Sequence, residues 1–507
     1  MGAPRALLAA AVAHHRAGRL AQAKAIYERV LRAEPDNADA LLLLGQLAHH
    51  AGHDDEAEAA FARAVAVAPG FAEAWIGLGQ LRRARGKPGA AADCFRRAIA
   101  LMPKVAGLRI DLGIALHQAG DPNAAIAEYR RAAALVPDTA PERVDAWRNT
   151  AIAHLDLGRH DEAEAAFHAV LRAKHGGRWW NASAFDGEAA NHGNAPPPTA
   201  TPGEGPRAST FKLRDASDQI DHLVAKGRID PSFSAMAARY RAVGDEIART
   251  HGPEASATLT GSQIARIGGF YDRVIHYPKL SRLAGRAVNP GLDFAAIEDG
   301  YLSSAVSVTT FDDLLAPEAL RALRDFCLEA TIFFGYSGAR FVGADLAGGF
   351  NGGLLYQIAE ELKARLPRVL GEHTLTNAWV YRCRNESPGV EAHTDQGAVT
   401  FNFWITPDAA NLEPGRGGLL VYAKEQPYDW DWRAINTFKY RPETLARIND
   451  FLASAETVTI PYRENRAVLF HSNLFHKSDR VRFRDGFENR RMNVTMLFGR
   501  RPERRPN

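Results

Sequence analysis

The sequence predicts a multidomain protein in which an all-α solenoid of repeated helical hairpins precedes a β-rich domain braced by helices. Three observations predict this fold class. A 34-residue pattern recurs within residues 38–105, a segment rich in Pro, Gly, Ala, Ser and Thr occupies residues 175–210, and short strand-like runs replace the helical spacing from about residue 302. The chain of 507 residues is also longer than one hydrophobic core usually organises.

The composition is typical of a globular protein, with 46% hydrophobic and 24% charged residues. A formal net charge of only +3 argues against nucleic acid as a partner, and the basic tail at residues 501–507 is expected to be a solvated terminus. The three cysteines lie far apart, so we expect no disulfide framework and a reducing, cytoplasmic location. The apolar run Leu7–Ala13 is too short to cross a membrane, so we expect no membrane association.

The first predicted element is the repeat. Residues 38–71 and 72–105 carry the same kinds of residue at eight positions, namely Leu41/Trp75, Leu44/Leu78, Gly45/Gly79, Gly52/Gly86, Ala57/Ala91, Phe61/Phe95, Ala64/Ala98 and Pro69/Pro103. Small residues stand where two helices touch, a glycine stands in the turn, and a proline ends the second helix. This pattern resembles the tetratricopeptide repeat (TPR). The resemblance implies about five repeats, the last an atypical cap, and a TPR solenoid over residues 1–174.

Stacked repeats of this kind leave a concave surface. The resemblance implies that the first helix of each repeat lines this groove, through His49, His50, Arg83, His117 and Gln118. Such grooves bind peptide segments, so we expect a protein or peptide partner. For any single one of these residues, a merely solvated helix face is the alternative.

The next segment, residues 175–210, is expected to be a flexible linker. Helical spacing returns after it, for example at Ile220, Leu223 and Val224, so we interpret residues 211–299 as a helical bridge. Nothing in this bridge suggests chemistry.

The last two hundred residues predict a β-barrel or sandwich braced by helices. Two helices are expected, one from Pro317 to about Phe333 and one from Leu354 to Leu366. Strand-like runs are Ser303–Phe311, Asn377–Cys383, Ala398–Ile405, Leu419–Tyr422, Thr457–Ile460, Ala467–Phe470 and Met492–Phe498.

Polar residues on these strands suggest a metal site. His393 and Asp395 are two apart, so on an extended strand their side chains point the same way, and His476 follows an apolar strand downstream. Two imidazoles and one carboxylate on one face of an octahedral ion leave three positions open, which suits ferrous iron with a bidentate ligand and dioxygen. The His-x-Asp spacing alone is weak, because it also occurs at residues 53–55 and 154–156 within the repeats.

Residues 300–500 resemble the iron(II)/2-oxoglutarate-dependent dioxygenases, more distantly the prolyl hydroxylases. The resemblance rests on "HTDQGAVTFNFWITPD", "GGLLVY", "AVLFHSNLFHKSD" and "RRMNVTMLFG". It implies a double-stranded β-helix (jelly-roll) domain that uses Fe(II), 2-oxoglutarate and O2, with ascorbate as a possible reductant. By the same resemblance, His393, Asp395 and His476 are the catalytic metal ligands, Arg491 binds the distal carboxylate of 2-oxoglutarate, and the cosubstrate pocket includes Tyr381, Asn402 and Trp404. An aspartate in the ligand set implies hydroxylation and not halogenation.

Several alternatives stay open at this point. Asp395 and His476 are further apart than is usual in the family, and the excess corresponds to residues 429–456, which form either a lid carrying Trp430 and Trp432 or a structural excursion. His471 competes with His476 as a ligand, and Arg490 competes with Arg491. The expected function is hydroxylation of a protein or peptide side chain recruited by the repeats. The alternatives are a TPR scaffold with an inactive barrel and a cupin-like metal hydrolase or isomerase.

Overall fold

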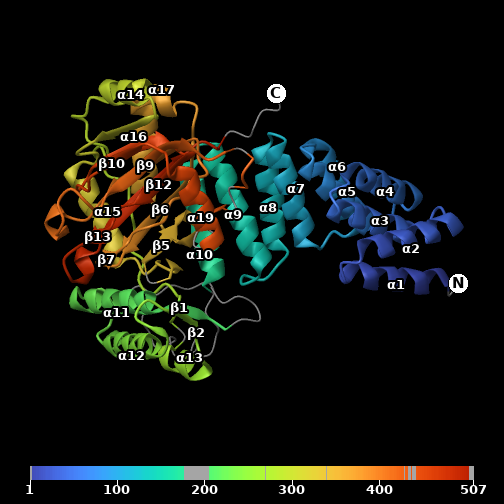
Figure 1. Ribbon diagram of the computed structural model, residues 1–507, viewed down its shortest axis with the longest axis horizontal. Helices are drawn as coiled ribbons and strands as arrows, with labels where there is room; N and C mark the ends of the chain where they lie inside the picture. Colours follow the sequence, from blue (N-terminus) through green and yellow to red (C-terminus); the bar gives the residue numbers. More distant parts are fainter. Residues whose placement is uncertain are drawn as a thin grey trace. The chain divides into compact units, whose positions relative to one another are not determined.

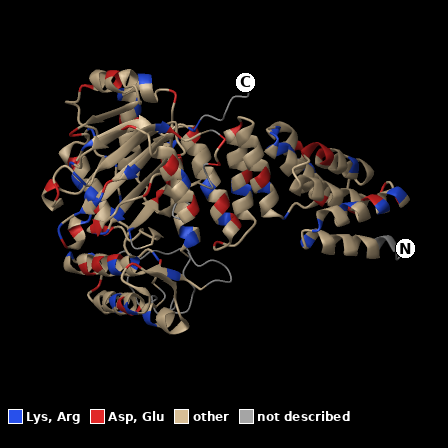
Figure 2. Ribbon diagram, viewed as in Figure 1, with Lys and Arg blue, Asp and Glu red and all other residues tan. Residues whose placement is uncertain are grey.

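The computed structural model describes residues 3–175, 205–268, 270–338, 340–427, 429–431, 435–436 and 441–501 (Figure 1). The chain forms two compact units, residues 1–157 and 158–507. Most of the predicted flexible linker, residues 176–204, and the basic tail from residue 502 lie outside the described residues. Basic and acidic residues are interspersed along the helices of both units (Figure 2), in keeping with the small net charge. Within the described part of the chain, no helix combines the length and apolar character that crossing a membrane requires.

The first unit consists of successive helical hairpins. Its helices are α1 (Ala3–Arg16), α2 (Leu20–Ala33), α3 (Ala38–His50), α4 (Asp54–Val67), α5 (Ala72–Ala84), α6 (Pro88–Leu101), α7 (Ala106–Gln118), α8 (Pro122–Ala134) and α9 (Pro141–Asp156). The hairpins α3/α4 and α5/α6 coincide with the two aligned 34-residue segments, so the predicted all-α repeat is confirmed.

The small residues of the repeat are required by helix packing. A Cβ atom on Gly45 would lie 2.7 Å from the Phe61 ring, and one on Gly79 would lie 2.9 Å from the Phe95 ring. Both distances are shorter than van der Waals contact allows, so a larger residue would clash at either position. The aromatic ring of each second helix therefore packs directly on the glycine of its first helix. The turn glycines Gly52 and Gly86 have φ of 78° and 68°, a left-handed conformation that glycine adopts without strain.

Helix α10 (His160–Lys174) belongs by sequence to the predicted fifth repeat, yet it packs within the second unit. His160 Nδ1 lies 2.6 Å from Glu360 Oε1 on α16 (Gly353–Arg365), and Asn351 donates to the carbonyl oxygen of Glu164 at 3.1 Å. The second compact unit therefore begins at residue 158, whereas the sequence predicts that the solenoid ends at residue 174.

The second unit continues with a helical section that has a core of its own. Its elements are β1 (Arg207–Ser209), α11 (Thr210–Ala225), α12 (Phe233–His251), β2 (Ser256–Thr258) and α13 (Gly261–Ile267), and β1 pairs with β2. Helix α14 (Phe294–Ser303) follows in the chain but contributes no residue to this core. The predicted linker was thus too long by a few residues. It overlapped β1, because the pairing of β1 with a strand about fifty residues later leaves no local sequence signal.

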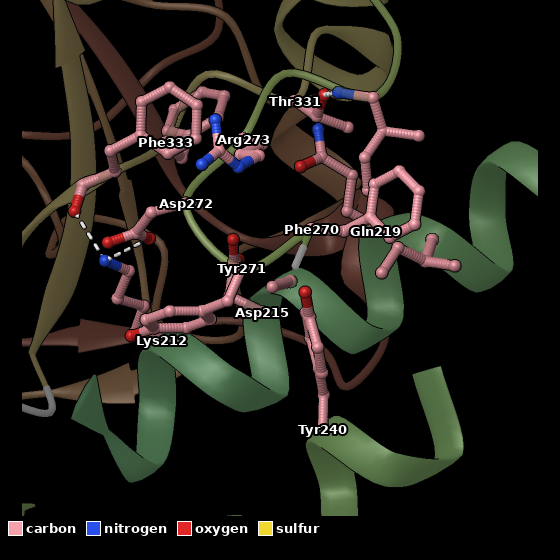
Figure 3. A pocket seen from close by; sticks show the side chains of 14 residues that line it. Lys212, Asp215, Gln219, Tyr240, Phe270, Tyr271, Asp272, Arg273, Thr331 and Phe333 are labelled. Carbon is pink, nitrogen blue, oxygen red and sulfur yellow. Dashed lines mark hydrogen bonds and ion pairs between the residues drawn. The ribbon is translucent and has the colours of Figure 1, made fainter. Parts of the chain in front are cut away.

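A small cavity of about 50 Å³ lies between α11 and the segments around residues 270–275 and 331–334 (Figure 3). At its edge, Lys212 Nζ forms a buried ion pair of 2.6 Å with Asp272 and donates to the carbonyl oxygen of Phe334. Because both charges are buried, loss of either partner would leave an uncompensated charge between α11 and the rest of the unit.

The β-rich section contains two larger antiparallel sheets and one short two-stranded pair (Figure 1). The seven-stranded sheet has the order β3 (Val308–Phe311), β11 (Ala467–His471), β8 (Val399–Trp404), β14 (Met492–Phe498), β6 (Leu375–Cys383), β5 (Phe341–Asp345) and β4 (Gly335–Ser337). The three-stranded sheet has the order β10 (Thr457–Ile460), β9 (Leu419–Glu425) and β12 (Leu474–Ser478). Side chains of both sheets belong to one buried cluster, so the sheets pack on each other around a common core.

The remaining elements surround these sheets. They are α15 (Pro317–Glu329), η3 (Leu346–Gly348), α17 (Pro367–Leu370), β7 (Glu386–Ser387), η4 (Asp408–Ala410), α19 (Pro442–Leu452), β13 (Val481–Arg482) and η5 (Phe487–Asn489). The strands predicted at residues 457–460 and 492–498 have the observed bounds. The run predicted to start at Ser303 was wrong in its first half, because α14 ends there and β3 begins only at Val308.

Candidate metal centre

His393, Asp395 and His476 converge on one point. One side-chain ligand atom from each residue lies within 4.8 Å of the other two. The two imidazole centroids are 4.4 Å apart, and His476 Nε2 lies 3.5 Å from Asp395 Oδ2. Asp395 and His476 are 5% and 3% exposed, and His393 is half-buried. The three residues thus form a cluster of metal-ligand type with one partly accessible member.

The backbone around the cluster differs from the sequence prediction. His393 and Asp395 were expected on a strand, but β8 begins at Val399, and His393 instead forms an isolated antiparallel bridge with His476. His476 was expected after a turn, yet it lies within β12. The amide of His393 donates to the carbonyl of His476 at 3.0 Å, and the amide of Asp395 donates to that of Ser472 at 2.9 Å. This segment crosses from the small sheet to the large one, so it cannot continue β8.

The tautomers of both histidines follow from their hydrogen bonds. His393 Nδ1 lies 2.8 Å from the carbonyl oxygen of Glu391, and His476 Nδ1 lies 3.1 Å from that of Leu474. Because a carbonyl oxygen only accepts, each Nδ1 must carry the hydrogen when these bonds form. Each Nε2 then keeps its lone pair, which is the form that binds a metal ion.

Asp395 is oriented by the strand that follows it. Thr400 donates from its hydroxyl to Asp395 Oδ2 at 2.9 Å, and the same hydroxyl lies 2.9 Å from that of Ser472. Thr400 is fully buried, so this contact is shielded from water. This hydrogen bond fixes the orientation of the Asp395 carboxylate within the cluster.

Arg491 is a buried cation with no ion pair to any carboxylate in the described residues. Its side chain donates to the carbonyl oxygens of Gly417 and Gly418 at 2.6 and 3.2 Å, and to Asn493 Oδ1 at 3.2 Å. The residue is only 1% exposed. A buried charge is costly unless it is paired, so this guanidinium suits an anionic ligand.

Arg490, the sequence alternative, is already neutralised. It forms ion pairs of 2.8 Å with Asp215 and 2.5 Å with Asp218, both on α11. The two adjacent arginines therefore differ in their surroundings. Arg490 pairs with carboxylates of the protein, whereas Arg491 pairs with none in the described residues and could pair with an anionic ligand.

The predicted pocket residues lie on strands next to Arg491. Asn493 stands opposite both Trp404 and Tyr381, and Thr495 stands opposite Asn402. The Trp404 ring lies 5.7 Å from the Arg491 guanidinium. Within the described part of the chain, Asn402 Oδ1 and Trp404 Nε1 are buried without a hydrogen-bond partner. Such unsatisfied atoms are rare in folded proteins and indicate a place for a polar ligand.

Two further groups have surroundings that the sequence did not show. His471 lies outside the cluster, 3.3 Å from Glu425, and this contact lowers the pKa of Glu425 to about 2. Cys383 packs beside Arg491, and burial raises the pKa of its thiol, an effect that the guanidinium partly offsets.

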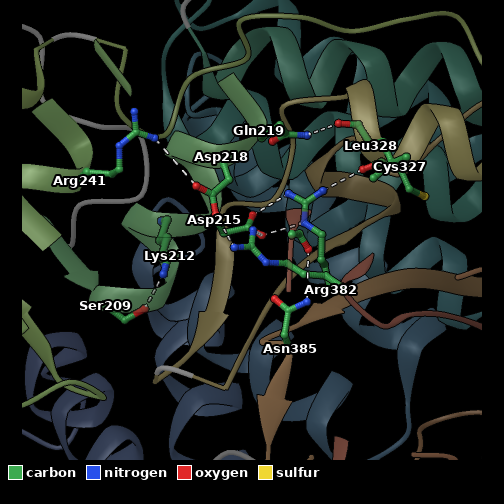
Figure 4. A network of polar contacts seen from close by, with 12 residues as sticks. Ser209, Lys212, Asp215, Asp218, Gln219, Arg241, Cys327, Leu328, Arg382 and Asn385 are labelled. Atoms are coloured by element: carbon green, nitrogen blue, oxygen red, sulfur yellow. Dashed lines mark hydrogen bonds and ion pairs between the residues drawn. The ribbon is translucent and has the colours of Figure 1, made fainter. Parts of the chain in front are cut away.

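Asp215 is a supporting residue that the sequence analysis missed. Arg382 on β6 binds both of its carboxylate oxygens, at 2.9 and 2.6 Å, and Arg490 shares one of them (Figure 4). Asp215 and Arg382 are almost fully buried. No local pattern reveals such a contact, since 167 positions separate the two residues and the buried face of α11 also carries other polar residues, among them Lys212 and Gln219.

The groove residues of the repeats are engaged with neighbouring side chains. His117 lies 2.7 Å from Asp156, His49 lies 2.9 Å from Asp54, His50 lies 3.0 Å from His15, and Arg83 lies 3.9 Å from Asp111, while Gln118 is exposed. A larger hollow of about 450 Å³ lies elsewhere in this unit, among α6, α7 and α8, with Arg96, Arg109 and Arg131 around the apolar Leu112 and Leu116.

Comparison with known proteins bears on the first part of the chain. Tetratricopeptide-repeat family models match residues 14–81, 76–140 and 110–177, so the N-terminal region is built of TPR units, as predicted. No curated protein matches the chain.

The solved structures that resemble this chain cover about a third of it. The MamA protein is 26% identical over 34% of this chain and 93% of its own, with a TM-score of 0.32. YrrB, described as a TPR protein with an unusual peptide-binding site, is 18% identical over 33% of this chain and 84% of its own, with a TM-score of 0.30. A thermophilic TPR protein of Thermus thermophilus is 24% identical over 34% of this chain and 91% of its own, with a TM-score of 0.26.

Proposed function

We propose that this protein is an Fe(II)/2-oxoglutarate-dependent oxygenase that hydroxylates a protein or peptide side chain, and that its β-rich section is a double-stranded β-helix. One observation carries the proposal. Two imidazoles whose Nδ1 atoms contact backbone carbonyl oxygens and one carboxylate form a compact set, in the same domain as a buried arginine that pairs with no carboxylate of the described residues. This donor set is the one that non-haem ferrous oxygenases use.

The residues present fit this cofactor and cosubstrate. His393, Asp395 and His476 would hold the ion on one face, and Arg491 would pair with the distal carboxylate of 2-oxoglutarate through its forked donors. Asn402 and Trp404 offer the unsatisfied polar atoms beside it. When bound, iron with 2-oxoglutarate supplies the activation of O2 that couples decarboxylation to hydroxylation. The protein contributes orientation and a site largely shielded from water.

Substitution of Arg491 tests the cosubstrate part of this proposal. We expect Arg491→Gln to raise the KM for 2-oxoglutarate about 10- to 100-fold, because a charge-assisted hydrogen bond to a carboxylate contributes about 1.5–3 kcal/mol. The measurement is succinate formation against 2-oxoglutarate concentration, with Fe(II) and ascorbate present. Arg480→Gln, which removes an exposed arginine of the same unit, is the matched control and should leave the KM unchanged. An equal KM in wild type and Arg491→Gln would remove Arg491 from the site.

The substrate class rests on the TPR region. Repeats of this type bind protein or peptide partners, and the hollow among α6, α7 and α8 adds an apolar surface whose rim carries Arg96 and the ion pairs of Glu128 with Arg109 and Arg131. Three buried, unbridged cysteines fit a reducing cytoplasmic setting. Partners retained by the full-length chain should gain one oxygen atom when Fe(II), 2-oxoglutarate and O2 are added, as measured by peptide mass spectrometry. Partners that bind but gain no oxygen would favour the scaffold function.

A further inference from the structure

The segment between β9 and β10 packs behind the metal-ligand cluster. We call the described residues of this segment, Trp430, Ile435, Asn436 and helix α19, the insert. Ile435, Ile448 and Leu452 of the insert share a buried cluster with Ala392 and Phe475. Ala392 precedes His393, and Phe475 precedes His476. The insert therefore contacts the immediate neighbours of two ligands. Trp432 and residues 437–440 lie outside the described residues.

Hydrogen bonds also fix a residue that lies between two of the ligands. Thr394 stands between His393 and Asp395, and its carbonyl oxygen accepts a hydrogen bond from Asn436 Nδ2 at 2.8 Å. Its hydroxyl donates to Gln426 Oε1 at 2.7 Å, and Gln426 donates in turn to the carbonyl of Trp430. Both polar groups of Thr394 are thus held from the insert side, which limits rotation of the peptide units that carry the ligands.

Aromatic contacts fix the backbone next to His476. Neighbouring side chains on a strand point to opposite faces, so Phe475 faces away from the ligand cluster. Its ring lies 5.9 Å from that of Phe451 and 6.4 Å from that of Trp430. The guanidinium of Arg447 covers the Trp430 ring at 4.0 Å. These rings hold β12 from its outer face while His476 points to the inner one.

We propose that the insert is a positioning element that sets the geometry of the three metal ligands from behind, and that it does not act as a lid. The inference rests on the proposed iron site. A lid closes over the open face of a site and exposes its contacts when it opens, whereas the apolar contacts of the insert lie in a buried cluster with Ala392 and Phe475, the residues that adjoin two ligands in the chain. Outer contacts of this kind orient metal ligands and typically change metal affinity 10- to 100-fold.

Cobalt binding to the full-length protein tests this inference without turnover. Co(II) is titrated into metal-free protein, and its visible absorption reports both affinity and ligand geometry. We expect Asn436→Ala to weaken Co(II) binding about 10- to 100-fold and to shift the absorption bands. Asn289→Ala is the matched control, because it also removes an amide-to-carbonyl hydrogen bond, of 3.0 Å to Asp313, in the same unit. Phe451→Leu tests the aromatic contact independently by the same Co(II) titration, and we expect it too to weaken Co(II) binding. This variant provides the test if Asn436→Ala does not fold.

Two further measurements separate the possible failures. His393→Ala should abolish the cobalt spectrum; if wild type shows none, or His393→Ala leaves it unchanged, the proposed metal site itself is wrong. If His393→Ala removes the spectrum while Asn436→Ala and Phe451→Leu bind Co(II) like wild type, the site stands and the positioning role of the insert is overturned. Circular dichroism of each variant shows that it is folded.

Discussion

Asp395→Ala is expected to reduce Fe(II)-dependent succinate formation to the level measured without protein. Asp395 is the only anionic member of the ligand set, and it is 5% exposed, so its charge attracts a cation in surroundings that screen it little. Removing it leaves two neutral imidazoles, which hold a divalent ion far less well than a complete set. The measurement is succinate released from 2-oxoglutarate with Fe(II) and ascorbate, together with iron retained after gel filtration.

The chain supplies its own control for this experiment. Asp55 belongs to another His-x-Asp triplet, and its side chain is 91% exposed and paired with Arg85 on a neighbouring helix. Asp55→Ala should therefore turn over like wild type. Turnover that survives Asp395→Ala would show that the cluster is not the site. If wild type itself releases no succinate, the TPR scaffold becomes the better account of this protein.

The three triplets also show what sequence could predict and what it could not. Residues 53–55 and 154–156 were set aside because they fall in repeats, and in the structure Asp156 pairs with His117 of an adjacent helix. The choice of residues 393–395 depended on a strand and a distal histidine downstream. Periodicity located β10, β11 and β14 closely, because each alternates or forms one apolar run.

What the sequence missed depends on long-range pairing. β12 carries the three polar residues His476, Lys477 and Ser478, so it shows no apolar run, and it exists because β9 pairs with it. β4 and β5 likewise form by pairing at the edge of the large sheet. Such partners are fixed by tertiary contacts, which override the local preference of a short segment. The sequence itself favoured Arg491 over Arg490, because Asn493 and Thr495 share its strand face, but the ion pairs that engage Arg490 depend on the position of α11, which no local pattern gives.

The buried contact of Asp215 predicts the largest loss of stability. We expect Asp215→Ala to lower the free energy of unfolding of the second unit by about 3–5 kcal/mol, because it leaves buried charges without their partner. Arg382 is 0% exposed and would keep only the carbonyl oxygen of Cys327 (Figure 4) and the faces of two aromatic rings, Phe333 at 3.9 Å and Phe487 at 4.5 Å. Denaturant unfolding followed by fluorescence and circular dichroism measures the change.

Asp218→Ala is the comparison that isolates this effect. The Asp218 side chain is 25% exposed and pairs with Arg490. Because Arg490 would still pair with Asp215 in this variant, we expect the free energy of unfolding to fall by only about 1 kcal/mol. Because Arg490 immediately precedes Arg491, Asp215→Ala should also raise the KM for 2-oxoglutarate under conditions in which the variant remains folded, whereas a purely structural contact would change stability alone. Equal losses of stability in the two variants would show that water reaches the Asp215 contact and compensates Arg382. In that case α11 would not hold the strand that presents Arg491.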